Sequence, residues 1–382
     1  MSDLHHRKAN LLISLVGVRF DRGIGEYIRL YLPYLCKEFK NNLFIVSNFK
    51  LPLDLLQIIA KYNCKLLTKK ISTPIFEQLY IPYIIRQFNI KAAYFPANTF
   101  PLIKINDVKY IVTIHDLIFL SKDIKPKKVY QKLGKLYRGF ILKKGIKKID
   151  TILAGSYATL NEIKNVFNNI SLTNDNVIYN PFDFSKHTEK DDSILEQLNL
   201  KKNNYLYTIS GTADNKNLEF VFSAFSKLKN IYPNLKLVVS GVPNKQDQQC
   251  YSKLLNLLNI KDSVIFTNYI SNEQKASLIS NAKAFLFLSK SEGFGRPIIE
   301  ALLYGATVIA SDIEVFREIG GKYIYYVNIN DENCLVDLVD LFKNSHQNNI
   351  NEVYSYLRSK FDVDILSKKL IKKLYNTIEE KK

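Results

Sequence analysis

The sequence is poor in the residues that build metal, redox and disulfide sites. Only four of its 382 residues are cysteines, and no two of them stand close enough to form a CxxC-type motif. This spacing favours reduced thiols in a cytosolic protein. Long apolar runs are also missing, since no stretch approaches the ~20 residues of a membrane-spanning helix. No charged-then-apolar signal pattern precedes the first strand-like segment, so we expect a soluble or peripheral protein.

Acidic residues are scarce beside basic ones. The chain has 54 Lys and Arg against 36 Asp and Glu, a formal net charge of +18, which favours an anionic partner such as nucleic acid, an anionic membrane or a phosphorylated ligand. Codon usage in an AT-rich genome is the alternative explanation for part of this excess. Tryptophan is absent, and the 24 Tyr and 23 Phe are spread through core-like segments. Because no nucleic-acid-binding signature or stacking platform accompanies the charge, we predict no nucleic-acid partner. A basic nucleic-acid-binding protein remains the alternative from another class.

Short apolar runs of strand character alternate with longer helical patterns along the chain. Many of these runs are apolar throughout, which is typical of parallel strands covered on both faces. The alternation predicts right-handed βαβ units and an α/β fold. The expected strands are residues 10–16, 43–47, 92–95, 109–114, 151–154, 205–210, 235–241, 263–267, 284–288, 307–310 and 324–327.

The strand–helix pattern runs twice, and a polar, charged stretch at residues 181–203 separates the halves. We therefore expect two doubly wound Rossmann-like domains, at residues 1–184 and 185–360, which face each other across a cleft. Residues 361–382 predict a last amphipathic helix that packs back on the N-terminal domain. Its apolar face carries Leu366, Leu370, Ile371 and Leu374. Open α/β sheets bind ligands beyond the C-terminal ends of their strands, so functional residues are expected there.

The candidate functional segment, residues 289–321, follows an apolar strand. Its sequence is SKSEGFGRPIIEALLYGATVIASDIEVFREIGG. Pro297 suits the first turn of a helix, where its missing N–H costs nothing. The two glycines of EGFG let the backbone approach a ligand, and the start of a helix is suited to a diphosphate. Glu292 and Glu300 can accept hydrogen bonds from sugar hydroxyls. On these two glutamates alone, a turn with one solvated and one capping carboxylate is an equal alternative.

This segment resembles the signature of family 4 glycosyltransferases, which are retaining enzymes of GT-B fold. Their E-x7-E element is written much like EGFGxPxxEA. The positions in register are Glu292, Gly293, Phe294, Gly295, Pro297, Glu300 and Ala301. The continuation GATVIASDIEVFREIGG is also similar, with Ala306 in place of the frequent Pro. The resemblance covers nearly the whole chain and extends to bacterial O-antigen and capsule mannosyltransferases, so it implies GT-B architecture.

Two segments of the first half resemble the same family. The segment that begins at Arg22 reads RGIGEYIRLYLPYL and is similar to the N-terminal glycine loop and helix of the family. Arg22 stands in place of the first Gly, whereas Gly23 and Gly25 are retained. VTIHDLIFL is similar to the strand that ends in His-Asp, here His115 and Asp116. The resemblance implies that this histidine contacts sugar or phosphate. The alternatives are a structural histidine at the end of a buried strand and an aspartate that caps the following turn.

The second half supplies the remaining implied roles. SGTADNKNLEFVFSAF resembles the segment that opens the second domain, and its Lys216 would neutralise the donor diphosphate as the sugar–phosphate bond breaks. The resemblance assigns Glu300 to the nucleotide ribose and Glu292 to the transferred sugar. Asn215 stands where Arg is common. The expected catalytic residues are Glu292, His115 and Lys216, and the expected donor-binding residues are Gly23, Gly25, Asp116, Phe294, Gly295, Arg296 and Glu300.

The family resemblance implies a retaining hexosyltransferase of surface-polysaccharide assembly. Its donor would be a GDP-, UDP- or dTDP-sugar, used without a metal, and its acceptor a lipid-linked saccharide of O-antigen, lipopolysaccharide or capsule biosynthesis. A GT-B sugar-nucleotide epimerase and a phosphorylase are the alternatives within the enzyme class. A phosphorylase of the familiar type would need a pyridoxal-phosphate site and a much longer chain.

Residues 122–148 form a strongly basic stretch, with eleven Lys or Arg and one acidic residue, Asp123. Apolar residues recur in it at helical spacing. They are Val129, Leu133, Leu136, Tyr137 and Phe140. This is the pattern of an amphipathic helix that lies on anionic lipid, and equally that of a surface helix whose apolar side faces the core. Because many relatives act on lipid-linked acceptors, we predict a cytoplasmic protein, peripheral on the inner face of the cytoplasmic membrane.

Overall fold

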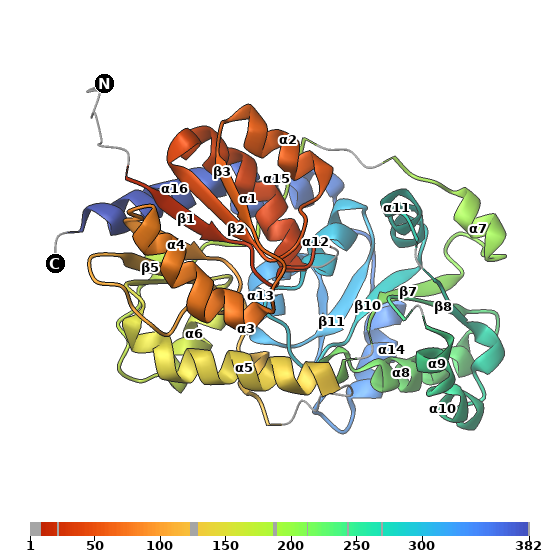
Figure 1. Cartoon of the computed structure of the whole chain (residues 1–382). Coiled ribbons are helices and arrows are strands. Elements are labelled where there is room, and N and C mark those ends of the chain that lie inside the picture. The colour runs from red at the N-terminus through yellow and green to blue at the C-terminus, as the bar shows by residue number, and fades with distance from the viewer. Residues whose placement is uncertain are drawn as a thin grey trace. The chain divides into compact units, whose positions relative to one another are not determined.

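The structure is a computed structural model that describes residues 9–20, 23–122, 129–185, 189–211, 213–242, 244–268 and 270–380. The chain folds into two compact units (Figure 1). Unit 1 comprises residues 1–120, 133–184 and 360–382, whereas unit 2 comprises residues 121–132 and 185–359. The last segment of the chain therefore belongs to the same unit as the first.

Unit 1 is built on a six-stranded parallel sheet with the order β3-β2-β1-β4-β5-β6. Its strands are β1 (Leu11–Ser14), β2 (Leu43–Ser47), β3 (Lys65–Thr68), β4 (Ala92–Phe95), β5 (Lys109–Ile114) and β6 (Thr151–Ala154). Successive side chains alternate between two cores, so that Leu12 and Phe44 lie in one while Leu11 and Leu43 lie in the other. This is the Rossmann strand order, which reverses between β1 and β4.

Helices cover both faces of the first sheet. They are α1 (Gly23–Phe39), α2 (Leu53–Lys61), α3 (Thr73–Ile75), α4 (Ile81–Gln87), α5 (Val129–Gly145), α6 (Tyr157–Val166) and α16 (Val363–Glu379). Helices α1, α2 and α16 line the core around Leu11, and α4, α5 and α6 line the opposite core. The predicted apolar face of the last helix is confirmed, since Leu366, Leu370 and Leu374 are buried in unit 1.

Unit 2 repeats the same topology. Its parallel sheet has the order β12-β11-β10-β7-β8-β9, with the reversal between β7 and β10. The strands are β7 (Tyr205–Ile209), β8 (Lys236–Ser240), β9 (Val264–Phe266), β10 (Ala284–Phe287), β11 (Val308–Ser311) and β12 (Tyr325–Val327). The helices are α7 (Ser193–Gln197), α8 (Leu218–Ile231), α9 (Lys245–Gln249), α10 (Ser252–Leu257), α11 (Asn272–Ser280), α12 (Arg296–Leu303), α13 (Glu314–Gly320), α14 (Cys334–Asn344) and α15 (Ile350–Phe361).

Every strand predicted from the sequence is present, so the α/β, doubly wound prediction is confirmed. Strand β3 was not predicted. It lies at the edge of its sheet, and its residues Lys65–Thr68 are exposed or half-buried. The apolar run typical of a strand buried on both faces is therefore absent from its sequence.

Asparagine occupies many of the left-handed backbone positions. Among the described residues, nine other than glycine have positive φ, and seven of these are asparagines. They are Asn63, Asn89, Asn98, Asn199, Asn203, Asn217 and Asn259. The short polar side chain of asparagine tolerates this conformation better than most others do.

Candidate active site

The turn that leads from β10 into α12 depends on glycine and proline. Gly295 is the N-cap of α12 and has a φ of 96°, a conformation that favours glycine. A Cβ at this position would also lie 3.0 Å from a ring carbon of Phe316. Pro297 stands in the first turn of the helix, and the Phe294 ring is buried. The strand–loop–helix turn that the sequence indicated is therefore present.

Lys216 and Glu292 meet beyond the ends of β7 and β10. Lys216 Nζ lies 2.7 Å from Glu292 Oε1, and Ser289 Oγ donates to the same oxygen at 2.8 Å. Only 12% of the Glu292 side chain is exposed, so their attraction is screened less than that of a surface ion pair. The strand order reverses at this point of the sheet, which is where open α/β sheets bind ligands.

Two asparagine side chains hold the lysine-bearing loop against the glutamate-bearing loop. The Asn215 amide donates to the Ser291 carbonyl at 3.0 Å, and the Asn217 amide donates to the Leu288 carbonyl at 3.1 Å. Asn217 has a φ of 53°, and it precedes α8. Asn215, which stands where a basic residue is common, is thus a buried brace between the loops rather than a second cation.

Glu300 is held between two cations. Lys275 Nζ on α11 lies 2.9 Å from Glu300 Oε2, and Arg296 Nε lies 4.0 Å from Glu300 Oε1. The glutamate and the arginine come from successive turns of α12, an i,i+4 pair that fixes the direction of both side chains. Lys275 was not predicted from the sequence, because it lies outside the signature segment and in a helix without a motif.

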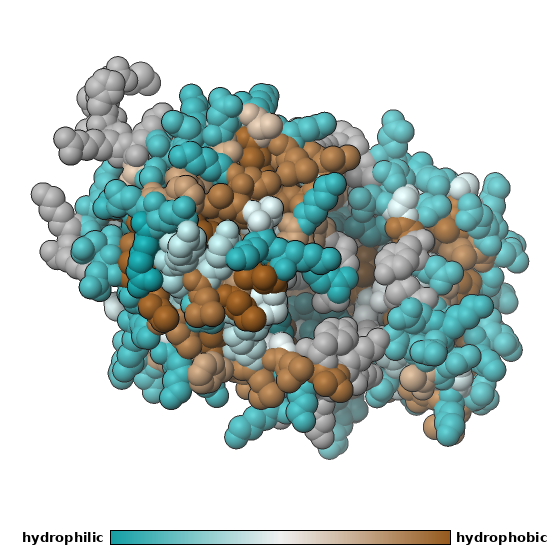
Figure 2. All heavy atoms as spheres, viewed as in Figure 1, coloured by the Kyte–Doolittle hydropathy of each residue, from teal (hydrophilic) through white to brown (hydrophobic). Residues whose placement is uncertain are grey.

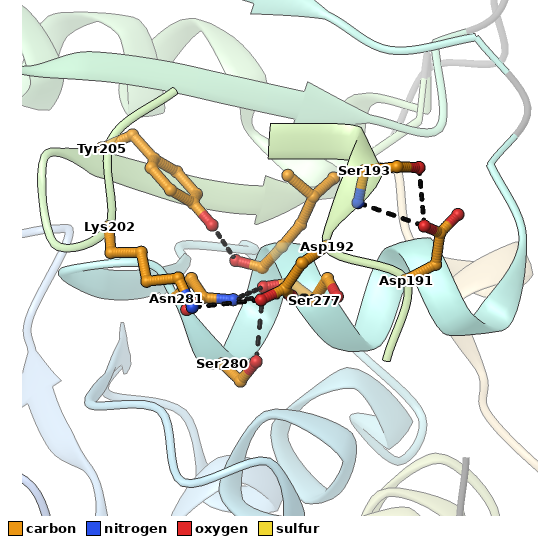
Figure 3. A network of polar contacts seen from close by, with 9 residues as sticks. Asp191, Asp192, Ser193, Lys202, Tyr205, Ser277, Ser280 and Asn281 are labelled. Carbon is orange, nitrogen blue, oxygen red and sulfur yellow. Dashed lines mark hydrogen bonds and ion pairs between the residues drawn. The ribbon is translucent and has the colours of Figure 1, made fainter. Parts of the chain in front are cut away.

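A polar network fixes the position of α11, the helix that carries Lys275 (Figure 3). Asp192, the N-cap of α7, accepts hydrogen bonds from Ser277 Oγ at 2.7 Å and from the Asn281 amide at 3.2 Å. Lys202 Nζ lies 3.0 Å from its second oxygen. The Ser277 hydroxyl and the Lys202 ammonium group lower the pKa of the Asp192 carboxyl. These contacts therefore bond α7 to α11, the helix that carries Lys275.

The two glycines predicted at the start of α1 have different surroundings. A Cβ at Gly25 would lie 2.3 Å from the Arg19 carbonyl oxygen and 2.4 Å from Phe20 Cα. At Gly23, a Cβ would meet nothing within 4 Å. Gly25 is thus required by the close approach of α1 to the preceding loop. Arg22, whose substitution for glycine was noted in the sequence, lies outside the described residues.

His115 is buried at the end of β5. Its Nε2 lies 2.8 Å from the Pro96 carbonyl oxygen, so this nitrogen carries the proton and donates it. Its ring packs edge-to-face on Tyr27, with centroids 4.8 Å apart, and its backbone N–H donates to Asn98 Oδ1 at 2.7 Å. Burial lowers the pKa of His115 to about 4, with the Pro96 carbonyl acting in the opposite direction. The ring is therefore neutral at pH 7.

Asp116 makes the turn contact that the sequence left open as an alternative. Its Oδ1 accepts from the Ile118 N–H at 3.2 Å, which is the contact of an Asx turn. The predicted roles of His115 and Asp116 towards a ligand stay predictions. Because its one ring proton is donated to the Pro96 carbonyl, the neutral imidazole could only accept a hydrogen bond from a hydroxyl, at Nδ1, and would offer no charge to a phosphate.

The burial of His115 predicts an acid-sensitive fold. The folded-state pKa is about 4 against 6.5 for an ordinary histidine, so the unfolded chain binds more protons between these values. The free energy of unfolding should therefore fall by about 3 kcal/mol as the pH drops from 6.5 to 4, and this effect should be absent above 6.5. Urea unfolding of the wild type and of His115→Gln at pH 7.5 and 4.5 measures it. Equal pH dependence in the two proteins would contradict the assignment.

The described residues of unit 2 pair Glu292 with the Lys216 ammonium group, and Glu300 with the Lys275 ammonium group and the Arg296 guanidinium group. Such a set can stabilise a departing phosphate and hydrogen-bond sugar hydroxyls. In the part of the chain that the structure describes, no group of three or more His, Cys, Asp or Glu side chains could hold a metal ion.

Comparison with known proteins gives a consistent relationship. The model of the family described as glycosyl transferases group 1 matches residues 190–355. The O-antigen chain mannosyltransferase RfbU of Salmonella typhimurium is 28% identical over 239 residues, which cover 60% of this chain and 64% of RfbU. The match thus spans slightly less than two thirds of the length of that relative.

Two further similarities extend over most of the chain. One is to the N-acetylgalactosamine-N,N'-diacetylbacillosaminyl-diphospho-undecaprenol 4-alpha-N-acetylgalactosaminyltransferase of Campylobacter jejuni, 23% identical over 82% of this chain and 84% of that protein. The other is to the crystal structure of Anabaena HepE in complex with UDP and glucose. It has a TM-score of 0.68 and 15% sequence identity, and it covers 96% of this chain and 99% of HepE. At that identity, the structural likeness shows the fold alone.

Proposed function

We propose that this chain, a glycosyltransferase that carries a glycosyl transferases group 1 domain in a GT-B fold, transfers a hexose from a nucleotide-diphosphate sugar to a lipid-linked saccharide with retention at the anomeric carbon. The observation that carries the proposal is the pairing of Lys216 with Glu292 beyond the ends of β7 and β10. Glu300 follows on α12, where it pairs with Lys275. The similarity to RfbU, an O-antigen chain mannosyltransferase, and to the Campylobacter enzyme supports an acceptor of surface-polysaccharide assembly.

In the proposed reaction, the bond between the anomeric carbon and the donor diphosphate breaks, and its electron pair leaves with the diphosphate oxygen. The acceptor hydroxyl oxygen forms the new bond to that carbon, and its proton passes to the departing diphosphate. Lys216 would stabilise the charge that grows there, as groups aimed at developing charge do. Glu292 would accept hydrogen bonds from the transferred sugar, and Glu300 would accept from the ribose. The start of α12, at Gly295 and Arg296, would add backbone N–H groups.

A thermal-shift panel of UDP-, GDP- and dTDP-sugars tests the donor assignment. A ligand that binds only the folded protein raises the unfolding temperature by mass action. We expect one of these donors to stabilise the wild type and to bind Glu300→Ala about 10-fold more weakly, because a charged acceptor of hydrogen bonds is lost. Glu219→Ala removes an exposed glutamate of α8 and is the matched control. Transfer of the sugar to an acceptor separates this function from that of an epimerase.

Two negative results of the thermal-shift panel would contradict different parts of the proposal. If no nucleotide sugar stabilised the protein and DNA binding weakened steeply with salt, the basic charge would serve nucleic acid and the proposed function would be wrong. If a donor bound but Glu300→Ala bound it equally well, the donor site would lie elsewhere. The same panel therefore distinguishes the two classes of function.

Two exposed apolar stripes support a further part of the proposal, docking on the cytoplasmic face of the membrane. On α5, Leu133, Leu136 and Phe140 are 55–62% exposed, so the alternative that this side of the helix faces the core is wrong for these residues. On α3, α4 and the π-helical turn between them, the stripe consists of Ile75, Leu79 and Tyr83. None of the described helices is long and apolar enough to cross a membrane.

Hydrogen bonds join the helical segments that carry the two stripes. The Gln78 amide donates to Tyr137 Oη at 3.1 Å, and the Tyr137 hydroxyl donates to the buried Glu77 carboxyl. Figure 2 shows hydrophobic atoms among hydrophilic ones over the region of α4 and α5. Lys132 and Lys135 lie on α5, whereas Lys127 and Lys128 fall outside the described residues. Apolar side chains beside lysines are the composition of a surface that binds anionic lipid.

Replacing both Leu136 and Phe140 with aspartate should release the protein from phosphatidylglycerol vesicles. Burial of each side chain in the lipid interface is worth about 1.5–3 kcal/mol, and each carboxylate adds repulsion. We expect at least a 100-fold weaker partition in vesicle sedimentation at low salt. Val166→Asp, on α6 of the same unit, is the matched control. A wild type that does not sediment with these vesicles at low salt would refute membrane docking.

A further inference from the structure

Unit 1 contains a cavity at the start of β6, the edge strand of its sheet. Its volume of about 420 Å³ lies within the usual range of small-molecule sites, about 300–1,000 Å³. The walls come from the short helical turn Ile146–Lys148, the first residues of β6, the loop 169–172 after α6 and the C-terminal end of α16. Because the strands are parallel, the cavity lies at the sheet edge opposite to His115, which follows the end of β5. It includes none of the residues predicted to bind the donor or to catalyse transfer.

The cavity is held in shape by contacts that need no ligand. Thr151 Oγ1 at the start of β6 and Thr377 Oγ1 on α16 lie 2.8 Å apart, and both side chains are buried. The Asn176 amide donates to the Ile152 carbonyl at 2.7 Å, and its Oδ1 accepts from the Thr173 N–H at 3.0 Å. A cavity whose walls are fixed in advance loses little conformational entropy when a ligand binds.

The lining combines aliphatic and polar side chains that differ in burial. The aliphatic ones are buried or half-buried, and they are Ile146, Ile149, Ile152, Ile170 and Leu172. The exposed polar ones include Lys147, Asn169, Ser171, Asn376 and Glu380. A ligand would therefore meet an aliphatic surface on its inner side and hydrogen-bonding groups towards the solvent.

The charged groups of the cavity favour an anion. Within the described part of the chain, neither Lys147 nor Lys373 makes an ion pair or a side-chain hydrogen bond. The Asp150 carboxylate is already engaged, since it pairs with Lys104. The cavity thus offers two unpaired ammonium groups beside the exposed carboxylate of Glu380. Ammonium groups only donate hydrogen bonds, and they attract negative charge.

We propose that this cavity binds a sugar that carries an anionic group, either phosphate or carboxylate. Lys147 and Lys373 would bind the anionic group. The amides of Asn169 and Asn376 both donate and accept, as sugar hydroxyls do, and the isoleucines would pack against the C–H face of the ring. The site goes beyond the proposed transfer and does not depend on it. Because the ligand would contact both β6 and α16, it would stabilise the packing of the last helix on unit 1.

Calorimetric titration of the full chain tests the site with mannose 6-phosphate, glucuronate, mannose and inorganic phosphate. We expect an anionic sugar to bind more tightly than mannose or inorganic phosphate, because only it engages both kinds of group. Lys373→Ala and Asn376→Ala should each raise its Kd about 3- to 10-fold, since one charged donor or one amide is lost. Lys372→Ala removes the neighbouring exposed lysine of α16, which does not line the cavity, and is the matched control.

Each outcome decides the proposal without requiring catalysis. Weaker binding in Lys373→Ala and Asn376→Ala, with the unfolding temperature of the free protein unchanged, supports it. Tighter binding of mannose 6-phosphate assigns the anionic group to phosphate, and tighter binding of glucuronate assigns it to carboxylate. If Glu300→Ala weakened the binding and Lys373→Ala did not, the sugar would occupy the candidate active site and the proposal would be wrong. No binding of either anionic sugar, or binding of mannose or inorganic phosphate that is equally tight, would also overturn it.

Discussion

Lys216→Ala should lower the rate of sugar transfer by about 100- to 1,000-fold, the loss typical when one donor aimed at developing charge is removed. The ammonium group lies 2.7 Å from Glu292 Oε1, which places it at the candidate site with its direction already set. Because the charge that it would neutralise grows in the transition state, turnover should fall more than donor affinity does. Steady-state kinetics with the donor found in the panel measure both quantities.

The stability of the same variant separates catalysis from structure. Glu292 would keep the hydrogen bond from Ser289, so we expect the free energy of unfolding to fall by only about 1–2 kcal/mol. The control is Lys290→Ala, which removes a neighbouring lysine that is 48% exposed and pairs with Asp214 at 3.5 Å. Transfer that survives in Lys216→Ala, or a rate loss matched by Lys290→Ala, would show that Lys216 is a structural residue.

Gly25→Ala should destabilise unit 1 by about 3 kcal/mol, because a side chain cannot fit without moving backbone. The added carbon would lie 2.3 Å from the Arg19 carbonyl oxygen and 2.4 Å from Phe20 Cα, and neither atom is a flexible side-chain end. The carbonyl of Arg19 and the Cα of Phe20 are backbone atoms, so the whole loop before α1 would have to move. Urea unfolding of the variant and of the wild type measures this loss of stability.

Gly23→Ala is the matched comparison for this prediction. The same methyl group at Gly23 meets nothing within 4 Å, and alanine restricts the unfolded chain more than glycine does. The free energy of unfolding should be unchanged or rise by roughly 0.5–1 kcal/mol. Similar losses in both variants would mean that close packing is not what requires glycine at position 25.

Local sequence signals predicted the turn at Gly295 and Pro297 but not the partners of its carboxylates. A positive φ and a helix start restrict the residue type at one position, so they are visible in the sequence. The role of Lys275 cannot be recognised from the sequence, because any helical position that is at least partly exposed accepts a lysine. Its pairing with Glu300 exists only after α11 and α12 are brought together across unit 2.

The sequence also could not reveal how far each polar residue is buried. His115 was placed correctly at the end of a strand, but its contact with the Pro96 carbonyl requires the neighbouring strand β4. On α5, spacing alone could not tell a core-facing stripe from an exposed one, since both have the same period. The large exposed fractions of Leu133, Leu136 and Phe140 depend on what packs beside the helix.

The asparagines at left-handed positions have a consequence for the entropy of folding. Glycine would accept the same backbone angles, but it leaves the denatured chain freer, at a cost of up to about 1 kcal/mol per position. Two of these asparagines also form tethers near the predicted functional residues, since Asn217 donates to the Leu288 carbonyl and Asn98 accepts from the His115 N–H. A glycine at either position would keep the turn and lose the tether. The chain thus restricts its loops partly before it folds, with the same side chains that hold them afterwards.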